Sequence, residues 1–181
     1  MNDSGKTKEK LKVTLIGDGG VGKTSLIQRF IHGTFQKDYI KTIGAQISNY
    51  KVEKGGHKTE LLFWDLAGQD DFHFLRPSFY KASKAAIIVY SLEKNDLGRE
   101  SLENIPKWLD DIQKFCGTIP ITIFANKVDL VKENLIKQEG IKEIMKDYKF
   151  LGFYITSAKT GQGVSIAFEN IIKELYNTFK N

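Results

Sequence analysis

The chain has 181 residues, of which 41% are hydrophobic and 27% are charged. This length suits one domain, and this composition excludes a disordered chain. Lys and Arg number 27 against 22 Asp and Glu, so the formal net charge is +5. That charge leaves nucleic acid or an anionic surface open as a partner. The single cysteine, Cys116, excludes an intramolecular disulfide and a cysteine zinc cluster, and it is typical of a reducing compartment.

No stretch of the sequence is typical of a signal peptide or a membrane span. Residues 1–10 are polar and lysine-rich, so we expect a flexible arm there and a single folded domain over residues 11–181. The longest apolar run, residues 85–90, is far shorter than the roughly 20 residues that cross a bilayer. Asn2 excludes N-myristoylation, and the last residues offer no cysteine for a lipid anchor. We therefore expect a cytoplasmic protein that reaches membranes only through partners.

Short β-branched runs alternate with segments of helical period, which predicts an α/β fold with a mostly parallel sheet and helices on both faces. A strand is predicted over residues 11–16, followed by a glycine-rich turn and a helix over about 23–32. The next two runs flank Gly55-Gly56, which indicates a tight hairpin and an antiparallel pair. They cover residues 46–53 and 58–65. Three runs that are apolar on both faces predict buried parallel strands over residues 85–90, 119–125 and 151–156, which makes six strands.

Two later segments have the apolar spacing of helices. One carries Leu102, Ile105, Leu109, Ile112 and Phe115, with Pro106 inside it. A proline there breaks or kinks the helix or marks its start, and the sequence does not choose between these outcomes. The final segment predicts a helix that packs on the core, through Val164, Phe168, Ile171, Ile172, Leu175 and Phe179.

A phosphate-loop pattern, G-x-x-x-x-G-K-[ST], occupies residues 17–24, between a predicted strand and a predicted helix. Consecutive backbone N–H groups of such a loop point at phosphate oxygens, and the helix N-terminus adds partial positive charge. We expect Lys23 to reach the β- and γ-phosphates and the Thr24 hydroxyl to ligate Mg²⁺. The predicted nucleotide-binding residues of this segment are Gly17, Asp18, Gly19, Gly20, Val21, Gly22, Lys23, Thr24 and Ser25.

Two further loops predict that the base is guanine. Asn126, Lys127 and Asp129 form an N-K-x-D pattern directly after a predicted strand. The Asp129 carboxylate can accept from guanine N1–H and from its 2-amino group, whereas adenine would leave it unpaired at roughly 1–3 kcal/mol. Lys127 can lie along the base, and Asn126 can tie this loop to the phosphate loop. After the last predicted strand come Ser157, Ala158 and Lys159, whose backbone amides can donate to the guanine 6-oxo group.

The segment Trp64-Asp65-Leu66-Ala67-Gly68-Gln69 ends the third predicted strand with residues suited to sensing a γ-phosphate. Asp65 can hold Mg²⁺, and Gly68 lets its N–H approach the phosphate closely. Gln69 can orient the attacking water, and Thr42 is the candidate for a second hydroxyl ligand of Mg²⁺. The predicted metal ligands are therefore Thr24, Thr42 and Asp65, and the predicted catalytic residues are Lys23, Thr42, Gly68 and Gln69.

In this order the motifs resemble those of the Ras superfamily of small GTPases, over residues 11–179. The resemblance implies a P-loop NTPase G domain that binds GTP or GDP with Mg²⁺ and slowly hydrolyses GTP to GDP and phosphate. It also implies that Phe35 packs on the guanine and that Tyr39 is the first-switch tyrosine. The two switches would be residues 36–44 and 66–80, ordered by GTP and released on hydrolysis.

The resemblance is closer to some branches of the superfamily than to others. Residues 64–72 and 101–109 are similar to Rab proteins, whereas residues 75–77, Leu-Arg-Pro, are similar to Rho proteins. The Rab comparison implies an apolar triad that presents the switch state to effector proteins, and ordinary packing of the hairpin is the alternative. The triad residues are Ile47, Trp64 and Phe79.

The partners that the resemblance implies are effectors, an exchange factor and an activating protein acting on a monomer. None of the three arginines, Arg29, Arg76 and Arg99, lies in the first switch. We therefore expect the activating protein to supply an arginine. Two alternatives stay open: a GTP-bound interaction module with little or no hydrolysis, and a P-loop ATPase or kinase. The charge alone suggests nucleic acid, but no nucleic-acid motif accompanies it, so we expect no nucleic-acid partner.

Overall fold

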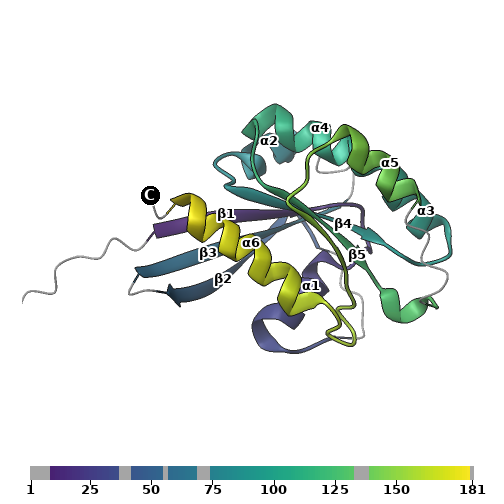
Figure 1. The fold of residues 1–181 in the computed structure, drawn as a ribbon, viewed down its shortest axis with the longest axis horizontal. Helices are drawn as coiled ribbons and strands as arrows, with labels where there is room; N and C mark the ends of the chain where they lie inside the picture. Colours follow the sequence, from purple (N-terminus) through teal and green to yellow (C-terminus); the bar gives the residue numbers. More distant parts are fainter. Residues whose placement is uncertain (1–8, 37–41, 55–56, 69–73, 133–138, 180–181) are drawn as a thin grey trace, which may run out of the picture.

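The computed structural model describes residues 9–36, 42–54, 57–68, 74–132 and 139–179 (Figure 1). They form one six-stranded sheet with the order β2-β3-β1-β4-β5-β6. Neighbouring strands are parallel except for β2 and β3, so the predicted mostly parallel sheet with one antiparallel hairpin is confirmed. The strands are β1 (Glu9–Ile16), β2 (Ala45–Lys54), β3 (His57–Leu66), β4 (Ala85–Ser91), β5 (Ile121–Asn126) and β6 (Gly152–Ile155).

Helices cover both faces of the sheet, as the alternating pattern predicts. In Figure 1, α1 and α6 lie on one face, and α2, α3, α4 and α5 lie on the other. The helices are α1 (Lys23–His32), α2 (Arg76–Tyr80), α3 (Asp96–Glu103), α4 (Ile105–Cys116), α5 (Glu139–Asp147) and α6 (Val164–Phe179), with a 3-10 turn η2 (Val128–Leu130) after β5. Because β1, β4, β5 and β6 are parallel, the loops at their carboxyl ends meet at one edge of the sheet.

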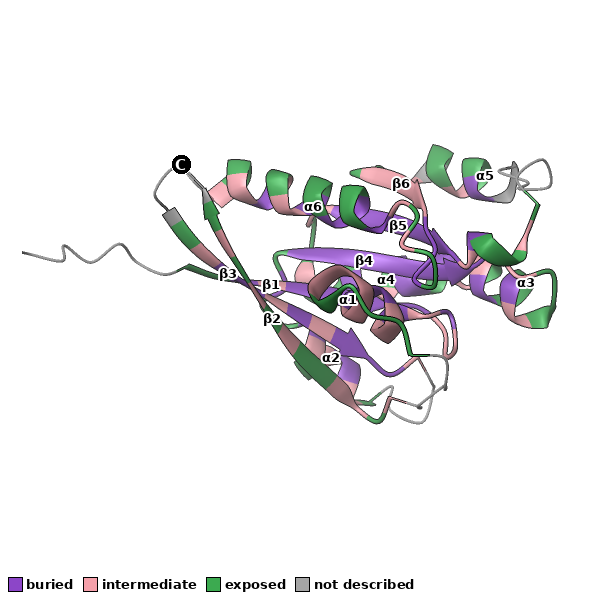
Figure 2. Ribbon diagram, turned by 90° about the horizontal axis from the view of Figure 1, so that it is seen from below, coloured by how far each residue is buried: buried purple, intermediate pink, exposed green. Residues whose placement is uncertain are grey.

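Two strands of the predicted sheet, β1 and β6, need correction. β1 begins at Glu9, and Glu9 and Lys10 pair with Thr59 and Glu60 of β3. These two residues therefore belong to the sheet and not to the predicted arm over residues 1–10, whose residues 1–8 lie outside the described residues. β6 is half-buried along its length, because it is an edge strand, whereas β4 lies between two strands and is buried throughout (Figure 2).

Pro106 begins a helix. α3 ends at Glu103, and α4 starts at Ile105 with Pro106 in its first turn. The missing N–H of a proline does no harm there, because first-turn N–H groups have no partner within the helix. The predicted single helix is therefore two helices, and Phe115, near the end of the second, is 39% exposed instead of buried.

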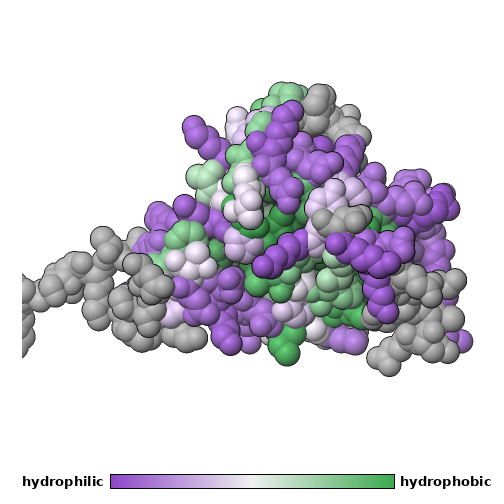
Figure 3. Space-filling view, turned by 45° about the horizontal axis from the view of Figure 1, so that its top comes forward, coloured by the Kyte–Doolittle hydropathy of each residue, from purple (hydrophilic) through white to green (hydrophobic). Residues whose placement is uncertain are grey.

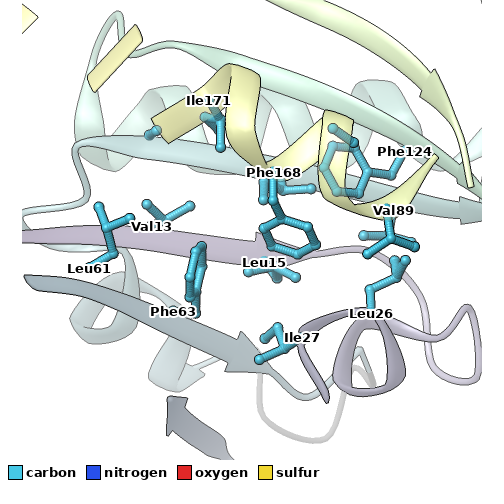
Figure 4. Close-up of a cluster of buried hydrophobic side chains, with 14 of the residues drawn as sticks. Val13, Leu15, Leu26, Ile27, Leu61, Phe63, Val89, Phe124, Phe168 and Ile171 are labelled. Carbon is cyan, nitrogen blue, oxygen red and sulfur yellow. The ribbon is translucent and has the colours of Figure 1, made fainter. Parts of the chain in front are cut away.

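The core between α6 and the sheet is built around stacked and edge-on aromatic rings. Phe168 stacks on Phe30 with ring centroids 4.4 Å apart and meets Phe63 and Phe124 edge-on, each at 5.3 Å. Figure 4 shows Phe168 pointing from α6 toward the sheet between these two rings. The predicted core role of the final stripe is confirmed: Val164, Phe168, Ile171 and Leu175 are buried, and Ile172 and Phe179 pack against them.

Figure 3 shows the molecule turned toward the side of α2, α3, α4 and α5. Hydrophilic residues cover much of this face, with hydrophobic residues visible between them. In the described part of the chain, no helix combines the length and the apolar character that a membrane span requires.

We predict that Phe168→Ala lowers the free energy of unfolding by about 3–5 kcal/mol, because it removes a ring that contacts three others and leaves a cavity. Urea unfolding measures the effect. The control is Ile166→Ala on the same helix, where the side chain is 61% exposed and the expected change is within about 0.5 kcal/mol. Equal losses for both variants would show that the aromatic cluster does not dominate the core.

Candidate nucleotide site

Lys23 lies inside the loop that precedes α1. Its ammonium group donates to the carbonyl oxygens of Gly17 and Asp18, at 2.8 Å each, so the side chain holds the loop closed. Lys23 is buried, and burial lowers its pKa to about 8, against the nearby charges of Asp65 and Asp18, which raise it. A cation in this position is surrounded by backbone and ready to pair with an anion that enters the loop.

Two glycines let other segments approach this loop closely. Gly22 caps α1 with φ +99°, and a Cβ there would collide with the side-chain amide of Asn126. A Cβ on Gly68, after β3, would collide with the backbone of Asp18 and Gly19. Any larger residue at either position would push the phosphate loop away from its neighbours.

Asn126, the last residue of β5, connects three loops. Its amide nitrogen donates to the carbonyl oxygen of Val21 at 2.9 Å. Its side-chain oxygen accepts from the backbone N–H of Ala158 at 3.1 Å and from the Thr156 hydroxyl at 3.3 Å. The predicted link between the N-K-x-D loop and the phosphate loop is therefore present, and the same side chain also holds the loop after β6.

These loops surround a cavity of about 270 Å³. The cavity lies at the carboxyl edge of the sheet, where open α/β folds bind ligands. Three lining residues, Gln28, Gln36 and Leu130, are absent from the sequence prediction. The predicted residues that line it are Gly20, Gly22, Thr24, Ser25, Phe35, Asn126, Lys127, Asp129, Ala158 and Lys159.

The Asp129 carboxylate is oriented at the cavity by its neighbours. The Ser157 hydroxyl donates to one of its oxygens at 2.6 Å, and the Lys159 ammonium lies 3.9 Å from the other. The Lys127 ammonium forms an ion pair with Glu93, which follows β4, while the lysine lines the cavity. The ammonium group of Lys127 is thus held at Glu93, and the aliphatic stem of Lys127 is available for contact with a flat ligand.

A second group of oxygens lies where α1 and β3 meet. The hydroxyls of Thr24 and Thr42 are 3.0 Å apart, and Thr24 also hydrogen-bonds one carboxylate oxygen of Asp65. Asp65 is 1% exposed, and burial raises its pKa, although the charge of Lys23 opposes this. Its other oxygen is buried and has no hydrogen-bond partner among the described residues. Hydroxyl and carboxylate oxygens with spare capacity suit Mg²⁺, so these residues fit that ion.

Some predicted residues stand apart from the cavity. The side chain of Val21 is buried in the core, so only its backbone faces the loop. The carboxylate of Asp18 turns away from the cavity toward α3 and α4. Tyr39 and Gln69 lie outside the described residues.

Several supporting residues escape motif reasoning. Gln28 follows Thr24 by one helical turn on α1, and Leu130 directly follows Asp129, so helical period and adjacency would have found both. Arg29, also on α1, donates to the carbonyl oxygen of Ala158 at 2.7 Å and anchors that loop. Neither Arg29 nor Glu93 belongs to a recognisable pattern, because each acts on a residue far away in the sequence.

Comparison with known proteins decides the family. The model of the Ras family matches residues 12–177, which is most of the chain. The chain belongs to the Ras family. The members of this family are small GTPases that bind guanine nucleotide with Mg²⁺, so the predicted class, a Rab-like small GTPase of the Ras superfamily, is confirmed.

The relatives of this Ras-family chain include Rab proteins. It is 37% identical to "Ras-related protein Rab-26" of Rattus norvegicus over 166 residues, which cover 91% of this chain and 63% of the relative. The human Rab-26 has the same identity and coverage. "Ras-related protein Rab-18" of Lymnaea stagnalis is 34% identical over 170 residues, 93% of this chain and 81% of the relative. The chain thus spans less than two thirds of the length of the Rab-26 proteins.

The predicted apolar triad of this Ras-family protein lies on the β2–β3 hairpin, which carries Ile47 and Trp64, and on α2, which carries Phe79. Ile47 pairs with Trp64 across the two strands, and the rings of Trp64 and Phe79 lie 6.2 Å apart. The Lys12 ammonium lies 3.7 Å from the centroid of the Trp64 ring. Ile47 is 49% exposed, so the cluster is not fully buried by its own fold.

We predict that Asn126→Ala lowers the free energy of unfolding by about 2–4 kcal/mol, because it leaves the Val21 carbonyl and the Ala158 N–H buried without their partner. The measurement is urea unfolding of the two proteins. Asn170→Ala is the matched control, since that amide is exposed and bonds only within α6 to Ile166, and a change within about 0.5 kcal/mol is expected. A loss as small as that of the control would show that Asn126 does not hold the loops together.

Proposed function

We propose that this protein is a guanine-nucleotide switch that binds GTP or GDP with Mg²⁺ and slowly hydrolyses GTP. The single observation that carries this proposal is the 270 Å³ cavity in which the phosphate loop, the N-K-x-D loop and the Ser157–Lys159 loop converge. Family membership supports the same activity.

The base is proposed to be recognised by Asp129. Its carboxylate accepts from guanine N1–H and the 2-amino group, and the hydroxyl of Ser157 fixes its orientation. Adenine has no hydrogen on N1 and no 2-amino group, so it would leave the carboxylate unpaired. Phe35 and the stem of Lys127 contact the faces of the base, and both of these side chains line the cavity. The backbone N–H of Lys159 is the proposed donor to the 6-oxo group, because the N–H of Ala158 donates to the Asn126 side chain.

The phosphates are proposed to be held by the loop amides and Lys23, which is already desolvated and pre-positioned. Thr24, Thr42 and Asp65 are the proposed Mg²⁺ ligands, Asp65 acting through a water. Bound Mg²⁺ supplies charge neutralisation on the β- and γ-phosphate oxygens. The Gly68 N–H donates to the γ-phosphate, and Gln69 aligns the attacking water.

The proposed partners are proteins that distinguish the two nucleotide states. Ile47, Trp64 and Phe79 form the proposed effector contact, supported by the pairing of Ile47 with Trp64 on the hairpin and by the contact of Trp64 with Phe79 of α2. An exchange factor and an activating protein complete the cycle, and the latter supplies the arginine. Arg76, on α2, is buried against Trp108 of α4, which supports the view that it does not serve as that arginine. We propose a monomer that works in the cytoplasm and is recruited to membranes through partners.

We predict that Asp129→Asn weakens GTP binding by at least about tenfold and relaxes the preference for guanine toward xanthine, because an amide can donate to the 2-oxo group of xanthine. Competition between GTP and XTP for a fluorescent GDP analogue measures both effects. Asp96→Asn, in which an exposed carboxylate is changed on α3, should leave both affinities unchanged. An unchanged preference for guanine in Asp129→Asn would show that the base is recognised elsewhere.

We predict that Gln69→Leu slows GTP hydrolysis by at least about tenfold while GTP affinity stays within about twofold, because leucine cannot orient water. The wild-type rate should be on the order of 10⁻⁴ to 10⁻³ s⁻¹, since no arginine completes the site in cis. Single-turnover hydrolysis on Mg²⁺-GTP measures the rates. Gln113→Leu, at an exposed position on α4, is the control that should hydrolyse at the wild-type rate.

Two outcomes would contradict this account of hydrolysis. Equal rates for Gln69→Leu and the wild type would remove Gln69 from the reaction. A wild-type rate near 1 s⁻¹ without a partner would remove the need for an arginine supplied in trans.

A further inference from the structure

The second residue of the phosphate loop is an aspartate, which is an unfavourable charge beside phosphates unless it is directed elsewhere. Asp18 does not line the cavity. The Asn104 amide donates to one of its carboxylate oxygens at 2.8 Å, and the Trp108 indole N–H donates to the other at 2.7 Å. Two neutral donors at the start of α4 therefore hold the carboxylate on the side of the loop away from the cavity.

Trp108 also contacts α2 through its ring. The Arg76 guanidinium, at the first position of α2, lies 4.3 Å from the centroid of the Trp108 ring. Arg76 also forms an ion pair with Asp111 at 3.5 Å, one turn further along α4. The Tyr80 hydroxyl, at the other end of α2, donates to the same Asp111 carboxylate at 3.1 Å. α2 is thus attached to α4 at both of its ends, and one attachment is the ring whose N–H holds Asp18.

These groups are close enough to act on one another electrostatically. The charge of Arg76 lowers the pKa of Lys23, and the charge of Asp18 raises it. Arg76 and Trp108 are both buried, so the contact between them is screened little by solvent. A movement of α2 would therefore change both the ring contact and the field at the phosphate loop.

We propose that Trp108 is a positioning residue that couples the phosphate loop to α2, so that a protein partner that displaces α2 loosens Asp18 and speeds nucleotide release. This inference rests on the proposed function, because it takes GDP as the ligand of the loop. Its direction follows from the bonds: the indole N–H is held in place by Arg76 on one side and fixes Asp18 on the other.

The test is the rate at which the 181-residue chain releases a fluorescent GDP analogue in the presence of Mg²⁺. Trp108→Phe keeps a ring under Arg76 but removes the N–H that donates to Asp18. We expect release to become about tenfold faster, because a hydrogen bond to a charged group is lost. Tyr148→Phe is the matched control: it removes an aromatic donor to a carboxylate of α4, Asp110, and should leave release unchanged.

A second variant separates coupling from a merely structural role. Arg76→Gln removes the cation from the Trp108 ring, and we expect release about threefold faster in the wild-type background. In the Trp108→Phe background the same change should accelerate release by clearly less than threefold, because the bond to Asp18 is already gone and only the change in the field at Lys23 remains. Equal acceleration by Arg76→Gln in both backgrounds would overturn the proposal, as would unchanged release in Trp108→Phe.

If Trp108→Phe does not fold, Asn104→Ala tests the other hydrogen bond to Asp18, with about threefold faster release expected and an unchanged rate overturning the proposal. Binding of the GDP analogue by the wild-type protein distinguishes failure of the coupling through Trp108 from failure of the proposed function. A wild type that binds no GDP analogue would overturn the proposed function itself, whereas normal binding with unaltered release in the variants would overturn only the coupling.

Discussion

The site depends on the side chain of Asn126, which satisfies groups from two loops while standing at the end of a buried strand. β5 is rigid because every one of its residues is buried, and Asn126, as its last residue, is held equally firmly. From there the amide reaches Val21 in the phosphate loop and Ala158 in the loop after β6. The phosphate loop and the base loops are thus fixed relative to each other before any ligand contributes to their order.

Much of this arrangement can be predicted from the sequence, because the loops follow strands and parallel strands end at one edge. The phosphate loop could be placed because its glycines and Lys23 sit between an apolar run and a helical run. The same logic placed Asn126 and Asp129. Such prediction works because each of these loops begins where a strand ends, and the apolar runs of the sequence show where the strands are.

Other features could not be predicted because they depend on neighbours distant in sequence. The apolar run of β6 is typical of a buried strand, but β6 is half-buried because it lies at the edge of the sheet. The position of a strand within the sheet cannot be seen in its local sequence. Pro106 is compatible with a kink or a start, and the separation of α3 from α4 decides between them. Glu93 pairs with Lys127 only because β4 and β5 are adjacent, so its role follows from the strand order.

The two tryptophans of the chain have a consequence for observing the protein in solution. Trp64 lies beside Phe79 of α2, and Trp108 lies under Arg76 of the same helix. All indole emission of this chain therefore arises from two rings that border one short helix, one near its start and one near its end. Intrinsic fluorescence, which in most proteins averages over the whole fold, is here a built-in local signal from α2 that needs no attached label.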